Sequence, residues 1–524
     1  MTVLTVEAAR ALDGEAIKCY GVPGVVLMEN AGRGAACFFH EFFHKYFPGP
    51  VLVVCGKGNN GGDGYVIARH LELWGWQVEV LVLAEHEAIG GDARINLEIL
   101  LKTDMRVSFA ADEERFQTTK ASLGRFAVVI DAIFGNGLTK DVEGHFAQAI
   151  MWINVSGAAV GAVDIASGTD ANCGRILGCG IRADCTATFI APKVGQMTGL
   201  GKVFGGEIRP VDIGLPRKLL ESVSETFTSI TSEEAARLLP KRPLAGHKGS
   251  FGHMLVVAGS TGKSGAAMLS ALGGARSGSG LVTVACPASL NIILESRLIE
   301  PMTCPLPDAG KGFLGVEAYD AIIALLDGKQ ALALGPGLGT AKTTEMLVCK
   351  LLEVCSLPMV LDADALNILC GNLSVLRNRR SRHVVMTPHP GEMARLVGKS
   401  VAEIEADRIG VARDFAREFG VVLVLKGAGT VVANPCGQVT INTTGNPGMA
   451  CGGMGDLLTG LIAGLIVQGV KPFEAAGLGV WLHGAAADKL AVMKGMAGLT
   501  ACEVAELLPE TMKELRETVL CENC

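Results

Sequence analysis

The chain has 524 residues, of which 49% are hydrophobic and 19% charged, and its formal net charge is -7. This length suits roughly two to four ordinary domains, and the apolar content is sufficient for packed cores. The acidic balance argues against a polyanion-binding surface, so we expect no nucleic-acid partner. Glycine contributes 68 residues while aromatic residues make up only 5%. That balance is typical of α/β enzymes whose strands end in glycine-lined ligand loops.

The first residues and the longest apolar stretch are both predicted to be ordinary helices. Residues 1–10 read as an amphipathic helix and lack the pattern of a secretory leader. Residues 457–470 are apolar but shorter than the roughly 20 residues that span a bilayer, which favours a buried helix. We therefore expect a cytoplasmic protein without a membrane partner, whose 16 cysteines are reduced thiols.

Cys521 and Cys524 have the spacing of a metal or redox pair, but no second pair or histidine motif accompanies them. We favour an inert tail, because chain ends are usually poorly ordered. Cys173, Cys179 and Cys185 also lack a ligand spacing, and we assign them no function.

Two segments begin alike, each with a β-type apolar run that breaks into glycines and then becomes helical. They are residues 51–64 and residues 254–266. Further strands are predicted at residues 78–83, 127–130, 159–163, 281–285, 331–334, 359–361, 384–386 and 421–425. Because the gaps are helix-sized, we expect parallel sheets covered on both faces, with ligands at the carboxyl ends of the strands.

A domain boundary is predicted near residues 216–228, where a Ser/Thr/Glu-containing stretch leads to a capping box at Thr231–Glu234. The predicted domains are residues 1–216 and 226–524. The fold class is α/β, with two three-layer domains.

The glycine loop Gly56–Gly64 is suited to binding an anion, since glycines let backbone amides approach a phosphate at a helix N-terminus. Its spacing is neither the dinucleotide fingerprint nor a P-loop. A plain tight turn is the simpler explanation, but it would not require Asn59, Asn60 and Asp63.

Polar residues also follow two later strands of the same half. Asp131 precedes Gly135–Gly137, and Asp164 leads to Ser167. Any one such aspartate is more often a helix cap, but several together with a glycine loop favour a ligand site. Hard oxygen ligands of this kind suit a group I or II cation rather than zinc.

These motifs resemble the NAD(P)H-hydrate epimerase family, a Rossmann-like fold, across residues 1–216. The matching segments are residues 21–32, 58–64, 131–137, 163–168, 191–195 and 211–216. That family interconverts the R and S forms of NADH or NADPH that carry water at C6 of the nicotinamide ring. The resemblance implies Asp164 as the catalytic acid/base.

The resemblance also implies a K+ site formed by Asn60, Asp131 and Ser167. Implied substrate contacts are Asp164 together with Asn59, Asn60, Gly61, Gly62, Asp63, Gly135, Asn136, Gly137, Leu138, Thr139, Lys140 and Asp141. Two departures from the family pattern are Ala166, where proline is usual, and Thr139–Asp141, where an Arg-Pro pattern is usual. Neither removes an implied ligand.

In the C-terminal half, the glycine-rich run Thr443–Asp456 precedes the apolar helix. Such a run directs backbone N–H groups toward one point, which favours an anion hole for a phosphoryl group. Asp456 is then the candidate base. A simple N-cap aspartate is the alternative, although capping needs no glycine cluster.

Further signals follow successive strands, at residues 248–249, 264–267, 335–339, 361–367, 387–392 and 426–430. Together they resemble the ADP-dependent NAD(P)H-hydrate dehydratase family, which has a ribokinase-like fold, across about residues 226–511. The resemblance implies nucleotide contacts from Lys426, Gly427, Ala428, Gly429, Thr430 and Gly455. It implies hydrate contacts from Ala266, Gly339, His389 and Asp456, with Asp456 catalytic, and Mg2+ at the phosphates.

The leading hypothesis is a fused repair enzyme acting on NADHX and NADPHX, with ADP as co-substrate and a homo-oligomeric assembly. The sequence does not decide whether ADP or ATP is the phosphate donor. We prefer ADP because the fusion of the two domains resembles that of microbial enzymes. Cys451 stands where relatives more often have a hydroxyl residue, and we interpret it as a tolerated small side chain. The alternatives are a ribokinase-like small-molecule kinase with a non-catalytic N-terminal binding module, and a non-enzymatic binding module.

Overall fold

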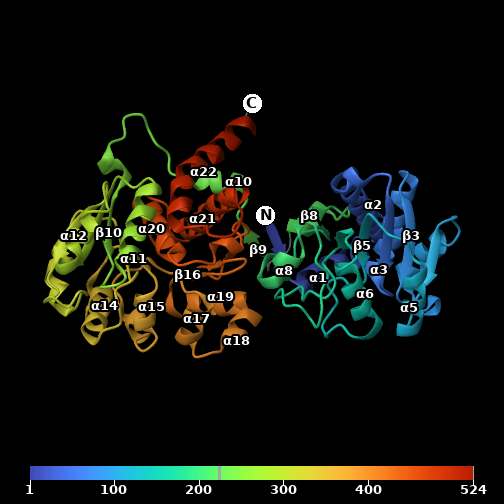
Figure 1. Cartoon of the computed structure of the whole chain (residues 1–524), viewed down its shortest axis with the longest axis horizontal. Helices are drawn as coiled ribbons and strands as arrows, with labels where there is room; N and C mark the ends of the chain where they lie inside the picture. Colours follow the sequence, from blue (N-terminus) through green and yellow to red (C-terminus); the bar gives the residue numbers. More distant parts are fainter. Residues whose placement is uncertain (222–225, 523–524) are drawn as a thin grey trace. The chain divides into compact units, whose positions relative to one another are not determined.

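The computed structural model describes residues 1–221 and 226–522, without the side chains of residues 226 and 518–522. The predictions for Cys521 and Cys524 therefore lie outside the described side chains. The chain divides into two compact units, residues 2–227 and a unit formed mainly by residues 228–524 (Figure 1). Each unit has its own sheet.

The sheet of the N-terminal unit has the strand order β4-β3-β2-β5-β6-β7-β8, and every neighbouring pair is parallel. The strands are β2 (Pro50–Cys55), β3 (Gln77–Val82), β4 (Arg106–Phe109), β5 (Val128–Ala132), β6 (Ala159–Val163), β7 (Cys185–Phe189) and β8 (Glu207–Val211), with a short β1 (Thr2–Leu4) ahead of them. Because the order reverses beside β2, the loops after β2, β5 and β6 meet at one edge.

Helices cover both faces of this sheet. The longer ones are α1 (Val6–Lys18), α2 (Gly24–Phe42), α3 (Asn59–Leu73), α4 (Gly91–Leu100), α5 (Glu113–Ser122) and α6 (Gly144–Asn154), and the shorter ones are α7 (Val194–Met197), α8 (Gly199–Phe204) and α9 (Arg217–Glu221). One core joins alternate strand residues to α2, α3 and α4, and a second joins the other strand residues to α5 and α6. Continuous apolar strands are expected where both faces are buried.

In the C-terminal unit the strand order is β9-β18-β17-β16-β15-β14-β13-β10-β11-β12. The strands are β9 (Thr226–Ser229), β10 (His253–Val257), β11 (Leu281–Pro287), β12 (Met302–Leu306), β13 (Ala331–Leu334), β14 (Met359–Leu361), β15 (Val384–Met386), β16 (Val422–Leu425), β17 (Val431–Ala433) and β18 (Val439–Ile441). Strand β17 is antiparallel to β16 and to β18. The predicted strands β10, β11 and β13–β16 are parallel as expected. The antiparallel β17 was not predicted, and its short connections to β16 and β18 can join only antiparallel neighbours.

Figure 1 shows the helices of this unit on the two sides of its sheet. One side carries α10 (Ser232–Leu238), α11 (Ser264–Arg276), α20 (Met454–Val467), α21 (Pro472–Lys494) and α22 (Ala501–Glu522), which share one core with the strands. The remaining helices are α12 (Asn291–Glu295), α13 (Tyr319–Leu325), α14 (Lys342–Val354), α15 (Asp364–Leu369), α16 (Ser374–Asn378), α17 (Pro390–Val397), α18 (Val401–Ala406) and α19 (Arg408–Phe419). The predicted three-layer α/β class is confirmed.

Several local predictions can be compared with the structure. The capping box at Thr231 is confirmed, since its side chain accepts from the Glu234 amide and the Glu234 carboxylate accepts from the Thr231 amide. The helix predicted for residues 1–10 is wrong at its start, because Thr2–Leu4 is extended and Thr5 caps a helix that begins at Val6. None of the described helices is both long and apolar enough to cross a membrane.

Helices α11 and α20 approach each other through glycines. A Cβ at Gly460 would lie 1.8 Å from the Ser270 carbonyl oxygen, and one at Gly273 would lie 2.2 Å from the Leu457 carbonyl oxygen. In addition, the Ser270 hydroxyl donates to the Asp456 carbonyl oxygen at 3.0 Å. This contact fixes the first turn of α20, which carries Asp456.

We predict that Gly460→Ala lowers the free energy of unfolding by about 3 kcal/mol, because its methyl group meets a backbone carbonyl that cannot move aside. The matched control is Gly265→Ala in α11, where a Cβ meets no atom within 4 Å and alanine favours the helix by about 0.5–1 kcal/mol. Chemical denaturation of the two variants measures both effects. Equal stability of the two variants would contradict the contact.

Candidate active sites

In the N-terminal unit, Asp164 follows β6 and meets a buried lysine. The Lys193 ammonium donates to Asp164 Oδ1 at 2.5 Å, and their side chains are 1% and 8% exposed. Asp164 has a φ of 63°, the left-handed region that non-glycine residues rarely adopt. Such strained positions cluster at functional sites, so the backbone and the ion pair both mark Asp164.

Lys193 is held from several directions. Its ammonium also donates to the Thr188 hydroxyl at 3.1 Å and to the Phe189 carbonyl oxygen at 3.0 Å. Gln196, two residues into α7, accepts from the Lys193 amide and donates to the Asp164 carbonyl oxygen, both at 2.8 Å. In the sequence, Lys193 belongs to residues 191–195, which resemble the epimerase family, but nothing there indicated a role for it. The one local sign of burial was that a lysine stands among apolar residues.

The three residues of the predicted cation site lie around one short segment. Ser167 Oγ donates to Asp131 Oδ1 at 2.6 Å and accepts from the Phe134 amide at 2.8 Å. The next residue, Gly135, lies against Asn60, whose Oδ1 would be 3.2 Å from a Cβ there. Asn60 Oδ1 and Nδ2 are both buried without a hydrogen-bond partner.

An unsatisfied buried amide costs about 1–3 kcal/mol, so Asn60 calls for a ligand. Burial raises the pKa of Asp131 to about 6, although bonds from Ser167 and Ile133 oppose the rise. A cation would favour the ionised carboxylate and coordinate the orphaned Asn60 oxygen. The donor set therefore fits an oxygen-ligated cation.

Two further carboxyl groups surround the Asp164–Lys193 pair. Burial, together with the charges of Asp164 and Asp13, raises the pKa of Asp63 well above its usual range. Burial raises the pKa of Asp13 to about 6, against the attraction of Lys193. Asp13 Oδ1 is buried without a partner, and the sequence indicated no role for this residue of α1. Because three carboxyl groups lie near a single lysine, their mutual repulsion favours protonation of at least one of them at neutral pH.

The predicted substrate contacts separate into two groups. Asn59–Asp63 form the first turn of α3, and the Asn136 amide donates to Asp164 Oδ2 at 3.4 Å. By contrast, Thr139–Asp141 are exposed, and among the described residues no hydrogen bond or ion pair joins them to Asp164. Gly135, Gly137 and Leu138 lie on the same connection.

In the C-terminal unit, a half-buried lysine marks the edge of the sheet. Lys426, which follows β16, donates to Asp362 Oδ1 at 2.9 Å, while Thr459 of α20 donates to Asp362 Oδ2 at 2.8 Å. The Lys426 ammonium also lies 4.0 Å from a Glu392 carboxylate oxygen. Burial opposes its charge, but Asp362, Glu392 and Asp456 outweigh that effect and raise the pKa of Lys426.

Asp456 belongs to the first turn of α20 and is not its N-cap, which is Gly453 at φ 93°. The capping alternative is therefore wrong. Burial and the neighbouring charges of Asp362 and Asp364 raise the pKa of Asp456 to about 6, while Lys426 lowers it. A carboxylate with a pKa near 6 is suited to accept a proton at neutral pH.

Other predicted residues lie around the same edge. The Gly339 amide donates to Asp364 Oδ2 at 2.8 Å, and Lys263 donates to the same oxygen at 3.0 Å. Ala266 lies one turn into α11, where its Cβ would be 3.0 Å from a Cβ on Gly337. Burial and the nearby charge of Lys426 lower the pKa of His389. The structure thus brings Ala266, Gly339, His389 and Asp456 to one edge.

The predicted nucleotide loop Lys426–Thr430 joins β16 to β17. Its glycines adopt positive φ, 142° at Gly427 and 69° at Gly429. Arg408, which is 4% exposed, donates to the carbonyl oxygens of Leu425 at 3.0 Å and Lys426 at 3.1 Å. Gly455 lies against this loop, since a Cβ there would be 3.2 Å from the Lys426 ammonium.

A carboxylate on α21 holds the start of the glycine-rich run. Asp488 accepts from the Gly445 amide at 2.8 Å and from the Asn446 amide group at 2.9 Å, so both of its oxygens are used. Nearby, His483 is 5% exposed, its Nε2 has no partner, and burial with the charge of Lys426 lowers its pKa to about 4. Neither residue was singled out by sequence.

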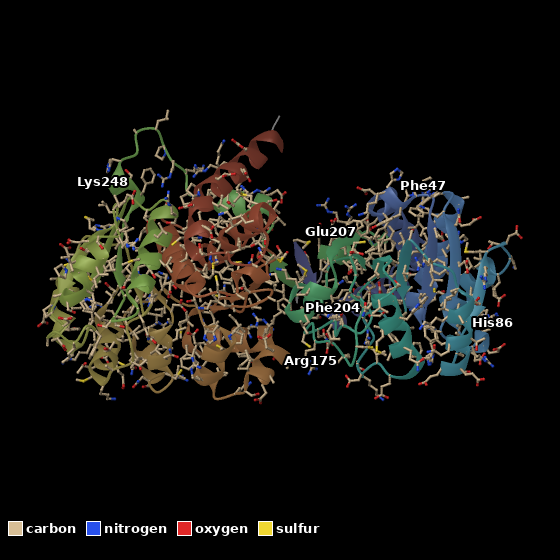
Figure 2. All side chains as sticks on the ribbon, viewed as in Figure 1. Phe47, His86, Arg175, Phe204, Glu207 and Lys248 are labelled. Atoms are coloured by element: carbon tan, nitrogen blue, oxygen red, sulfur yellow. The ribbon has the colours of Figure 1, made fainter. Side chains whose placement is uncertain are left out.

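Two other residues noted in the sequence lie away from these centres or make ordinary contacts. Lys248, labelled in Figure 2, lies in the turn η3 (Lys248–Phe251) ahead of β10, at the amino edge of the parallel strands. The Cys451 thiol donates to the Leu499 carbonyl oxygen at 3.2 Å. Among the described residues, no group of three or more His, Cys, Asp or Glu side chains could hold a metal ion.

Two family models match the chain. One, described as NAD(P)H-hydrate dehydratase, matches residues 254–510, and the other, described as YjeF-related protein N-terminus, matches residues 24–195. A crystal structure of an ADP/ATP-dependent NAD(P)H-hydrate dehydratase from Bacillus subtilis, co-crystallised with ATP and Mg2+, is 31% identical. It aligns with 55% of this chain and 99% of its own, with a TM-score of 0.48.

Two full-length relatives carry both halves. The bifunctional NAD(P)H-hydrate repair enzyme of Moorella thermoacetica is 43% identical over 524 residues, covering 99% of this chain and 98% of the relative. The enzyme of the same name from Escherichia coli is 35% identical over 505 residues, covering 96% and 92%. The chain therefore belongs to the family of bifunctional NAD(P)H-hydrate repair enzymes.

Proposed function

We propose that this chain repairs hydrated NADH and NADPH in two steps. The N-terminal unit interconverts the R and S epimers, and the C-terminal unit dehydrates the S form to NAD(P)H at the expense of ADP, giving AMP and phosphate. The observation that carries the proposal is the full-length similarity to bifunctional repair enzymes, with Asp164 present as a buried and Asp456 as a half-buried carboxyl group. We further propose a cytoplasmic, homo-oligomeric enzyme with no nucleic-acid or membrane partner.

For the epimerase step, we propose that Asp164 moves a proton to and from the C6 hydroxyl. Lys193 orients the carboxylate, since the ammonium contacts Oδ1 and leaves Oδ2 facing the Asn136 amide. Opening and reclosing the ring, or losing and regaining water, inverts C6. The proposed contacts from Asn59 to Asp63 and from Gly135 to Asp141 bind the cofactor around this centre.

A bound K+ supplies fixed positive charge beside the substrate phosphates. Asn60, Asp131 and Ser167 are the residues that would hold it, because they offer the buried oxygen atoms described above. Asn60 is in the first turn of α3, so a cation held by these residues would add its positive charge to that of the helix N-terminus.

For the dehydratase step, we propose that Asp456 takes the proton of the C6 hydroxyl. The hydroxyl oxygen then attacks the terminal phosphorus of ADP, the bond to AMP breaks, and a C6 phosphate ester forms. Loss of phosphate and of the C5 proton leaves the ring double bond of NAD(P)H. The net effect is removal of water from the hydrate, with its oxygen leaving in phosphate.

The proposed nucleotide contacts are Lys426 to Thr430 and Gly455, which the structure holds through Arg408 and Asp362. Mg2+ supplies charge neutralisation on the phosphates. Because the described residues form no three-ligand cluster, the ion would take most of its ligands from phosphate oxygens and water, as Mg2+ commonly does. ATP is the alternative donor.

The decisive test incubates the full chain with mixed NADHX epimers, K+, Mg2+ and either ADP or ATP. We expect complete recovery of NADH, measured by its near-ultraviolet absorbance, with the nucleotide dependence identifying the donor. Nucleotide consumption without any NADH would instead support a small-molecule kinase and overturn the proposal.

A second prediction concerns Asp164 and Lys193. Asp164→Asn should limit the recovery of NADH to the amount of S epimer present at the start. Lys193→Met should slow consumption of the R epimer about a hundredfold or more, because positioned proton transfer contributes roughly that factor. The exposed Lys102→Met is the control and should consume both epimers normally. S-epimer dehydration should be unchanged in all three variants. Consumption of the R epimer by Asp164→Asn above the spontaneous rate would refute this role.

A third prediction follows from the pKa of Asp456. A general base must be deprotonated, so kcat/KM for S-NADHX should be flat above about pH 6 and fall tenfold per pH unit below it. Asp456→Asn should lower kcat by about a hundredfold or more with little change in nucleotide binding. The exposed Asp320→Asn serves as the control. If the residual activity of Asp456→Asn still falls below about pH 6, the group that titrates there is not Asp456.

A further inference from the structure

A cavity of about 420 Å³ lies in the C-terminal unit, apart from the candidate active site. Its walls come from the segment after α10, the end of α11, the end of α20 and one face of α22. The lining residues that matter are Arg242, Arg276, Gln468, Lys513, Arg516 and Glu517.

The cavity is at the amino edge of the parallel strands. Gly278, which lines it, precedes β11, whereas the active-site residues follow the carboxyl ends of their strands. Helix α20 connects the two places, because its first turn carries Asp456 and its C-cap, Gln468, lines the cavity. With 14 residues, this helix separates them by about 21 Å.

The lining is strongly basic in an otherwise acidic chain. Arg242, Arg276, Lys513 and Arg516 line the cavity with a single carboxylate, Glu517. That carboxylate lies 3.7 Å from the Lys513 ammonium. Among the described residues, no ion pair involves any of the three arginines. Three guanidinium groups therefore share one cavity, and the carboxylate in its lining pairs with Lys513 rather than with an arginine.

Two of these guanidinium groups are held in place by backbone oxygens. Arg242 donates to the Gly278 carbonyl oxygen, and Arg516 donates to the Pro240 carbonyl oxygen at 3.0 Å. A Cβ at Gly278 would lie 2.2 Å from Arg242 Nη2, so the guanidinium packs directly against this glycine. Arg242 also stacks over Phe251, 4.3 Å from the ring centroid.

The three arginine side chains are exposed, so a dissolved anion can reach them, and their like charges lie close together. Burial lowers the pKa of Arg242, and the like charge of Arg516 lowers it further. Each guanidinium has five N–H donors in a planar fork, which matches the oxygens of phosphate, and only part of this capacity is used by the carbonyl bonds. The cavity volume is also within the range of small-molecule sites.

We propose that this cavity is a second, non-catalytic site that binds a phosphorylated small molecule through Arg242, Arg276 and Arg516. The ligand is a di-anion or poly-anion of the phosphate class. Its recognition requires neither the N-terminal unit nor the repair reaction, so the proposal is independent of the proposed function.

Methyl NMR of the full chain, labelled at methionine, tests the proposal with pyrophosphate as the probe. Met512 lines the cavity, and Met454 starts α20 beside the active site, so each reports one location. We expect pyrophosphate to shift the Met512 signal saturably. Arg242→Ala/Arg516→Ala should weaken this response at least about tenfold, because two charge-assisted contacts are lost. The Met454 response should not change.

The control variant, Lys342→Ala/Arg377→Ala, removes two exposed positive charges elsewhere and should leave the Met512 response unchanged. If the double arginine variant does not fold, Arg276→Gln is the second test, because Arg276 makes no hydrogen bond or ion pair among the described residues. The proposal would be overturned if pyrophosphate did not shift the Met512 signal. It would also be overturned if the shift were equal in the arginine and control variants.

Discussion

A lysine ammonium beside a buried carboxylate organises both units. Lys193 with Asp164, and Lys426 with Asp362, each lie where a strand of the sheet ends. Breaking such a pair leaves an uncompensated buried charge at a cost of about 3–5 kcal/mol, so neither partner can be lost cheaply. In both units the lysine also affects further acids, Asp63 and Asp13 in one, Glu392 and Asp456 in the other. Burial is the larger effect on these acids and raises their pKa values, and the lysine opposes that rise.

The fold followed from the sequence where the pattern was local and strong. Apolar runs ending in glycine placed β2 and β10 within one residue of their observed ends, and the capping box at Thr231 was visible in four letters. The antiparallel strands β17 and β18 were missed because short connections join them to β16 and to each other, whereas the equally short β14 and β15 are separated by helix-sized gaps. The extended start at Thr2–Leu4 was missed because its three residues lead directly into a helix.

The sequence predicted those residues of the candidate sites that belong to a motif, and missed the others. Asp131, Asp164 and Asp456 each follow a recognisable strand or glycine run, so sequence alone singled them out. Asp13, Arg408, His483 and Asp488 lie on helices with no motif, and each becomes notable only through burial or a long-range contact. Such roles depend on tertiary packing, which spacing along the chain does not encode.

The loop Lys426–Thr430, which we propose contacts the nucleotide, is held rigid by the hairpin that carries it. Both ends of this five-residue loop continue into paired strands, and Thr430 Oγ1 closes the loop internally by accepting from the Gly427 amide at 3.3 Å and donating to the Gly427 carbonyl oxygen at 3.1 Å. The backbone of this loop therefore loses little conformational entropy when a ligand binds. Ordering a residue costs about 1–2 kcal/mol of conformational entropy, and here folding has already met that cost. The loop is thus a rigid receptor, and affinity depends on contacts rather than on rearrangement.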